Sequence, residues 1–193
     1  MILTLRLAAK KLVHSLCFDQ GLTECDLETC EYGADLLLYT LFSTLGLLAV
    51  SFAIKRFTDT AIIIMTFYIN QTIGGGLHMS THAKCFALMV LGVFTGLFLC
   101  SFQLTALHWA SISMIGCYIL LKLPLVLHPN KEYLQYKSAK LVLHSRILTI
   151  IEAVLLLFLL YASPNLLPPF SVAIVLATAS RIAATLSSMK NKT

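Results

Sequence analysis

Charged residues are scarce in this chain of 193 residues, and their scarcity excludes several classes of protein. They make up 12% of the sequence, whereas hydrophobic residues make up 58%. Soluble domains carry about 25% charged and about 45–50% apolar residues. A water-exposed surface cannot be built from this composition, which excludes a soluble enzyme, a disordered chain, a coiled coil and a DNA-binding module. The composition predicts an integral membrane protein.

Acidic residues are fewer than basic residues, and they are unevenly placed along the chain. Nine Asp and Glu stand against 14 Lys and Arg, which gives a formal net charge of +5. Because the basic residues flank apolar runs, we expect contacts with anionic headgroups or an acidic partner, and no nucleic acid. Six of the nine acids lie near the N-terminus: Asp19, Glu24, Asp26, Glu28, Glu31 and Asp35.

A clean apolar core of a signal peptide is also missing, so we expect no cleavable signal. Arg6, Lys10 and Lys11 instead give residues 1–16 one basic and one apolar helical half. This pattern favours an amphipathic helix in the headgroup plane, and a helix that caps the bundle is the alternative.

The six cysteines do not predict a disulfide framework. Cys100 and Cys117 lie inside apolar runs, where cysteine behaves as a small hydrophobic residue. Cys25 and Cys30 share the acidic segment, which we expect to be a loop. Only Cys85 has neighbours that suggest chemistry.

Apolar runs predict an all-α bundle with about six membrane segments, since a crossing helix needs about 20 apolar residues. Residues 36–54 suit one span and 61–73 are marginal, while 85–121 is long enough for two helices. The last pair is expected to be joined through Pro164, Pro168 and Pro169, which stop helices. The expected parts of a single membrane domain, residues 1–193, are an amphipathic helix (1–16), a first hairpin (36–73), a catalytic segment (74–85), a second hairpin (86–127), a basic cytoplasmic loop (128–146) and a third hairpin (147–188).

The positions of the basic residues predict the orientation of the bundle. Lys131, Lys137 and Lys140 share one connection, whereas the connections after Gln103 and Ala162 carry no Lys or Arg. The positive-inside rule therefore places residues 74–85, residues 128–146 and the C-terminus in the cytosol. Lys55 and Arg56 then lie on the opposite side as an exception.

The segment whose residues could take part in catalysis is GGGLHMSTHAKC, residues 74–85. Three glycines disfavour a helix by about 1 kcal/mol each and let the backbone turn tightly or approach a ligand. A cysteine acts as a nucleophile only as the thiolate, which a nearby imidazole or a helix N-terminus favours. The segment therefore predicts a catalytic cysteine–histidine pair at Cys85.

The residues alone leave the base and the chemistry open. In a continuous helix His82 is nearer to Cys85, whereas His78 stands about 10 Å away along the axis. His78 folds back over Cys85 only if the glycines delay the helix. His78, His82 and Cys85 also suit a metal-dependent membrane protease. A further alternative is a small transporter or scaffold, with the glycines as a broken-helix site or a plain helix contact.

A glycine pair, one residue, a histidine and a cysteine seven positions later together resemble the accessory gene regulator B (AgrB) family. The resemblance continues in HPNK at residues 128–131 and in the length and number of spans, so it covers the whole chain. Two positions depart from the family pattern. Gln71 stands where an arginine is usual shortly before the glycines, and Met79 stands where a small residue is common.

The resemblance implies a bacterial membrane cysteine endopeptidase, a thiol protease of quorum sensing that needs no cofactor and no metal. It would cleave the C-terminal tail of an autoinducing-peptide precursor through an acyl-enzyme and promote thiolactone or lactone cyclisation. Cys85 is then the nucleophile and His78 the base, with His82 as the secondary candidate. Gly75, Gly76 and Gln71 are candidates for oxyanion or substrate contacts.

The resemblance also implies partners and a location. The substrate would be a short precursor with an amphipathic leader and an acidic tail, and a second copy of the chain would complete a homodimer. The protein would be a multi-pass protein of the bacterial cell membrane, with the active site facing the cytoplasm. Candidates for substrate docking are Lys131, Lys137, Lys140 and Arg181.

Glu152 and Arg181 are the only charged residues within 147–188. They reach similar depths if the two helices are antiparallel neighbours, and an isolated ion in hydrocarbon costs roughly 3 kcal/mol or more. We therefore expect a direct Glu152–Arg181 contact. The alternatives are an Arg181 that snorkels beside a protonated Glu152, or an Arg181 that receives a substrate carboxylate and replaces the charge missing at Gln71.

Overall fold

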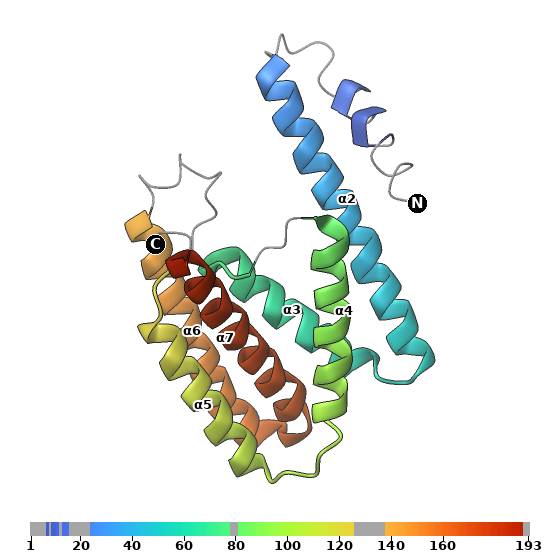
Figure 1. The fold of residues 1–193 in the computed structure, drawn as a ribbon. Coiled ribbons are helices and arrows are strands. Elements are labelled where there is room, and N and C mark those ends of the chain that lie inside the picture. Colours follow the sequence, from blue (N-terminus) through green and yellow to red (C-terminus); the bar gives the residue numbers. More distant parts are fainter. Residues whose placement is uncertain are drawn as a thin grey trace.

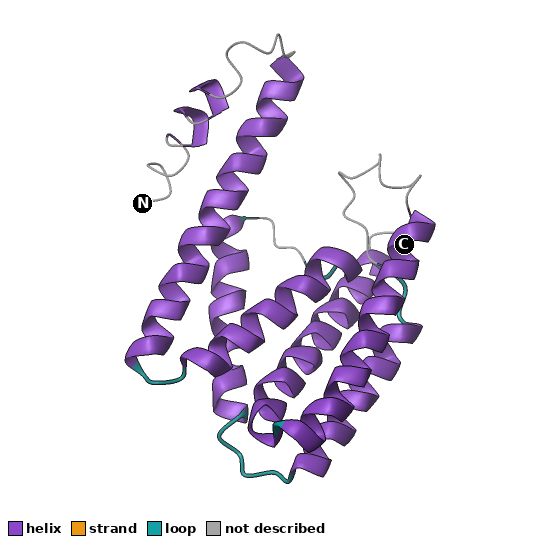
Figure 2. Cartoon of the chain, turned by 180° about the vertical axis from the view of Figure 1, so that it is seen from behind, coloured by secondary structure: helices purple, strands orange, loops and turns teal. Residues whose placement is uncertain are grey.

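The computed structural model describes residues 7, 9–11, 13–15, 24–77, 81–125 and 138–190. Within these ranges the chain is helical without any strand, which confirms the all-α expectation (Figures 1 and 2). The elements are α2 (Glu24–Ala53), α3 (Phe57–Gly74), α4 (His82–Leu99), α5 (Ala106–Lys122), α6 (Ser138–Ala162), the 3₁₀ turn η2 (Pro164–Leu166) and α7 (Leu167–Lys190).

Three stretches are long and apolar enough to cross a membrane: Cys30–Ala53, Ala139–Ala162 and Pro164–Met189. Two further apolar helices, Ala83–Leu99 and Ala106–Lys122, are shorter. Large apolar side chains such as Phe52, Phe98 and Phe158 are exposed, which suits a surface in contact with lipid. A membrane protein is therefore supported, while the number of crossings stays a prediction.

Helix α7 lies at the centre of the bundle and packs against α3, α4, α5 and α6. Its inner face is completely buried at Val172, Ala173 and Ile174. Pro168 and Pro169 do not end a helix, as we expected, but lie in the first turn of α7. A proline is tolerated there because the first turn has no internal acceptor for its missing N–H.

Two helices begin earlier than the apolar runs suggest. Helix α2 includes the acidic residues from Glu24, which we expected in a loop, and α6 begins at Ser138 rather than at residue 147. Apolar runs mark the part of a helix in lipid, whereas hydrogen bonding continues into the polar region. The polar start of α2 binds the N-terminal segment, since Glu31 contacts Lys10 at 3.2 Å and His14 at 3.8 Å.

The described part of the N-terminal segment has the predicted two faces. Its residues 7, 9–11 and 13–15 are helical, with Ala9 and Val13 buried and Lys10 and Lys11 exposed. This supports an amphipathic helix. Its position in the headgroup plane stays a prediction.

The connections of the bundle lie at two opposite ends (Figure 1). One end holds the glycine connection from α3 to α4, the end of α5, the start of α6 and the C-terminal end of α7. The turns from α2 to α3, from α4 to α5 and from α6 to α7 lie at the other end. The described parts of the segments that the basic residues assign to one side, namely residues 74–77, 81–85 and 138–146 and the end of α7, therefore share one end.

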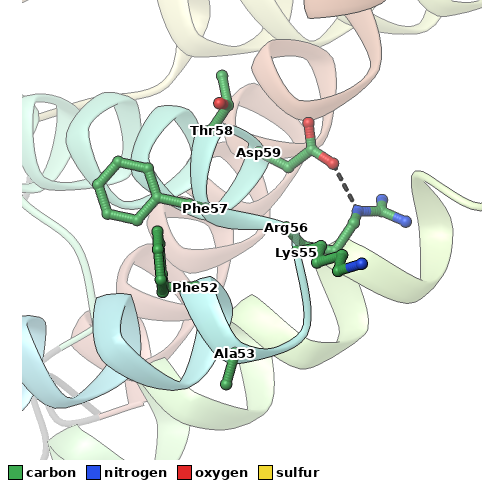
Figure 3. Close-up of a pocket in the computed structure, with 7 residues that line it drawn as sticks. All are labelled: Phe52, Ala53, Lys55, Arg56, Phe57, Thr58 and Asp59. Atoms are coloured by element: carbon green, nitrogen blue, oxygen red, sulfur yellow. Dashed lines mark hydrogen bonds and ion pairs between the residues drawn. The ribbon is translucent and has the colours of Figure 1, made fainter.

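The turn between α2 and α3 lies at the far end and lines a shallow pocket (Figure 3). Arg56 Nε donates to Asp59 Oδ2 at 2.6 Å, and its Nη2 donates to the carbonyl of Leu97 in α4 at 3.5 Å. Lys55 takes a left-handed conformation at φ 57° to complete the turn. This pocket is remote from the glycine connection, so the candidate site does not include it.

Candidate active site at the start of α4

Cys85 lies in the first turn of α4 and is exposed. The helix begins at His82, after Thr81, whose side chain accepts a hydrogen bond from the backbone N–H of Lys84 at 3.3 Å. The N–H of Cys85 donates to the Thr81 carbonyl at 3.1 Å. A capped helix N-terminus carries partial positive charge, which favours a thiolate nearby.

Two tyrosines from neighbouring helices contact the first turns of α4, just after Cys85. They are Tyr39 in α2 and Tyr68 in α3. The Tyr39 ring meets Phe86 edge to face at 6.1 Å, and the Tyr68 hydroxyl donates to Met89 Sδ at 3.0 Å. The cysteine therefore borders the region where α2 and α3 approach α4.

A side chain at each of the three glycines that precede this helix would meet a different obstacle. Gly75 has φ 69° and ψ 173°, a conformation that residues with a side chain rarely adopt. A Cβ on Gly74 would overlap the guanidinium group of Arg181, and a Cβ on Gly76 would overlap the side-chain amide of Gln71. The run therefore ends α3 and keeps the connection tight against α7.

Ser180 of α7 holds this connection by two hydrogen bonds. Its Oγ accepts one from Gln71 Nε2 at 2.5 Å and one from the backbone N–H of Leu77 at 3.1 Å. Gln71 thus bonds to α7 in the structure. Leu77 directly precedes the candidate base, His78.

Arg181 is only 2% exposed and is fixed from two further helices. Its Nη1 donates to the carbonyl of Leu120 in α5 at 3.3 Å and to Ser145 Oγ in α6 at 3.2 Å. A substrate carboxylate would have to displace packed helices to reach it. Its burial therefore favours a structural role over the docking role considered from the sequence.

The predicted direct contact between Glu152 and Arg181 is wrong. Glu152 is 4% exposed and accepts a hydrogen bond from Asn70 Nδ2 of α3 at 2.5 Å, while Arg181 bonds to α5 and α6. Both residues are described, and no ion pair within 4.0 Å joins them. The buried atoms Glu152 Oε2, Asn70 Oδ1 and Arg181 Nε have no hydrogen-bond partner within the described chain.

Of the remaining candidate site residues, the structure describes some and not others. Lys140 is exposed in the first turn of α6, and the starts of α6 and α4 lie at the same end of the bundle (Figure 1). His78, Lys131 and Lys137 lie outside the described residues, and of His82 only the backbone is described. The choice between His78 and His82 therefore stays a prediction.

Sequence reasoning missed Ser180 and Asn70. Both are small polar residues inside apolar helices, where the usual interpretation is a hydroxyl or amide bonded to its own helix. Ser180 has one distinguishing signal, because it directly precedes the only charged residue of its span.

Comparison with known proteins identifies the family. The family model for accessory gene regulator B (AgrB) matches residues 8–186, which is nearly the whole chain. No curated protein and no solved structure matches the chain. Since the match includes the glycine connection, Cys85 and the helices that hold them, the chain belongs to the AgrB family, which acts in the agr quorum-sensing system.

Proposed function

We propose that the protein is a membrane cysteine endopeptidase with Cys85 as the nucleophile and His78 as the general base. It removes the C-terminal tail of a quorum-sensing peptide precursor and closes a thiolactone or lactone ring. The observation that carries the proposal is an exposed cysteine in the first turn of a capped helix, nine residues after the last glycine of the run, in a chain of the AgrB family.

The first half of the reaction forms an acyl-enzyme. His78 takes the proton from the Cys85 thiol, and the thiolate attacks the carbonyl of the scissile peptide bond. The tetrahedral intermediate collapses when the imidazolium returns the proton to the leaving amine. The tail departs, and the N-terminal part of the precursor remains as a thioester on Cys85.

The second half releases a ring. A thiol of the bound precursor loses its proton to His78 and attacks the thioester, which forms the thiolactone and restores the Cys85 thiol. A precursor serine would give a lactone by the same path. Because exchange of one thioester for another is nearly balanced in free energy, the yield depends on keeping water away. A site at the membrane edge suits this need.

Backbone N–H groups of the glycine connection are the candidates for stabilising the oxyanion. Gly75 and Gly76 supply two such groups in the connection that leads from α3 to α4. A well-placed oxyanion donor is typically worth about 3 kcal/mol. Gln71 is less suited, because its Nε2 already donates to Ser180.

The basic end of the bundle is the proposed docking region for the precursor. Lys140 is exposed there, and Lys131 and Lys137 are close to it in the sequence. An acidic tail would be attracted to these lysines, and an amphipathic leader would lie in the same membrane surface. We further propose about six membrane segments, a homodimer and a site that faces the cytoplasm.

Cleavage of the precursor by purified protein tests the proposal. The substrate to use is a short precursor peptide with an amphipathic start, an internal Cys or Ser and an acidic end, which we expect to be encoded beside this chain. Cys85→Ala should release no tail, while Cys100→Ala and Cys117→Ala should retain cleavage. His78→Ala should also be inactive and His82→Ala active. Tail release by Cys85→Ala would overturn the proposal.

A further inference from the structure

Helix α7 contacts the glycine connection through two consecutive residues. Ser180 binds it by hydrogen bonds to Gln71 and Leu77, and Arg181 packs against Gly74. These contacts join segments that lie 103 and 109 residues apart in the sequence. The connection is therefore fixed to α7 before it enters α4.

The two bonds of Ser180 use the full acceptor capacity of its hydroxyl, since a hydroxyl oxygen has two lone pairs. One bond fixes the side chain of Gln71 in the last turn of α3, and the other fixes the backbone of Leu77, six residues further on. Between them the chain makes its glycine turn at Gly75. The hydroxyl thus ties the start of the turn to its end.

Arg181 fixes the part of α7 that carries Ser180. Its guanidinium group is held by Leu120 and Ser145, and it is almost completely buried. The part of α7 around Arg181 therefore cannot shift without breaking contacts to α5 and α6. Leu77, in turn, has a fixed backbone position one residue before His78.

We propose that Ser180 is a positioning residue of the cleavage reaction. By accepting a hydrogen bond from the N–H of Leu77, it fixes the backbone directly before His78 and so orients the imidazole toward the Cys85 thiol. This inference rests on the proposed function, because it needs His78 to act on Cys85. It assigns Ser180 no contact with the substrate.

The test compares Ser180→Thr with Ser180→Val, two variants of the same shape that differ by a hydroxyl. The probe is iodoacetamide, and mass spectrometry of the peptide that contains Cys85 gives the alkylation rate across pH. At pH 7 the rate for Ser180→Val should fall roughly fivefold to tenfold, as expected for loss of the hydrogen bond that holds the Leu77 N–H. Ser180→Thr should stay within about twofold of the parent protein, on the same scale.

Two further measurements separate positioning from general damage. At a pH where every thiol is ionised, Ser180→Val should react as fast as the parent protein, because the thiolate no longer needs a base. Hydrogen exchange of the Leu77 amide should be faster in Ser180→Val and unchanged in Ser180→Thr. The control is Ser171→Ala, which removes another buried hydroxyl bond of α7, to Trp109 at 3.3 Å, and should change neither readout.

The outcomes distinguish this inference from the proposed function. If His78→Ala leaves the alkylation rate at pH 7 unchanged, the proposed base is wrong. If His78→Ala slows alkylation but Ser180→Val and Ser180→Thr react alike, Ser180 is not a positioning residue. If Ser180→Val does not fold, Ser180→Ala replaces it, and an unchanged rate in that variant equally overturns the inference.

Discussion

The guanidinium group of Arg181 occupies the space that a side chain on Gly74 would need. The backbone of Gly74, the last residue of α3, therefore lies directly against the guanidinium group of Arg181 in α7. The buried cation is thus next to the glycine connection. This contact explains why the last residue of α3 is a glycine. It also makes the two residues mutually dependent.

Gly74→Ala should lower the thermal unfolding midpoint of the detergent-solubilised protein. Forcing a methyl group into packed space typically costs about 1–3 kcal/mol, which exceeds or offsets the gain of about 1 kcal/mol in helix propensity. Gly92→Ala in α4 is the matched control, because nothing lies within 4 Å of its added Cβ, and it should be neutral or stabilising. Unchanged stability of Gly74→Ala would refute the contact.

Reversing the charges of Glu152 and Arg181 should not restore folded protein. Glu152→Arg loses the hydrogen bond to Asn70 and buries a cation, and adding Arg181→Glu also removes the bonds to Leu120 and Ser145. Breaking a buried charged network on one side typically costs about 3–5 kcal/mol. Glu152→Gln, by contrast, keeps an oxygen for Asn70 and should fold. Size-exclusion chromatography measures the folded fraction, and recovery of the double variant would indicate a direct ion pair instead.

Thr81→Ala should slow the alkylation of Cys85 at neutral pH. The variant removes the side-chain cap of α4, and a helix cap is typically worth about 1 kcal/mol, so a decrease of roughly twofold to tenfold is expected. Thr81→Ser keeps the oxygen and should react normally. Thr105→Ala removes the equivalent cap of α5, a bond from the His108 N–H, and should leave Cys85 unaffected. An equal effect of both alanine variants would mean that the cap of α4 does not act on Cys85.

Single cysteines at opposite ends of the bundle should be labelled from opposite sides of the membrane. In a cysteine-free background, Lys140→Cys should react with an impermeant maleimide only after the cells are permeabilised, because the basic end is expected in the cytosol. Gln103→Cys, in the exposed turn after α4, should react in intact cells. Labelling of Lys140→Cys in intact cells would reverse the orientation.

The membrane class and most helices could be predicted from the sequence, because both depend on local composition. The uncharged stretch from 85 to 121 was expected to split into two helices, and α4 and α5 are those helices. The starts of α2 and α6 could not be placed from apolar runs, since a helix continues into polar sequence where no change of hydropathy marks its first turn. Pro168 was misjudged because a proline stops one helix but also suits the first turn of the next.

The sequence predicts those residues of the candidate site that stand out by their type and immediate neighbours, but not the contacts between helices. The glycines and Cys85 have unusual neighbours, so they could be found in the sequence. The partners of Glu152 and Arg181 depend on how α3, α5, α6 and α7 rotate against one another, which spacing along one helix does not fix. Similar depths of Glu152 and Arg181 in the membrane predict that these two residues pair, whereas in the structure Asn70 from α3 donates to Glu152.

The most direct test of the account is the mass of the protein after a brief reaction with the precursor peptide. The parent protein should gain the mass of the precursor without its tail, and the adduct should map to Cys85 and be released by hydroxylamine, as a thioester is. Cys85→Ser should hold the same fragment as a more stable ester, and Cys85→Ala should hold none. Release of the tail without any adduct at Cys85, or with the same rate in Cys85→Ala, would contradict the account.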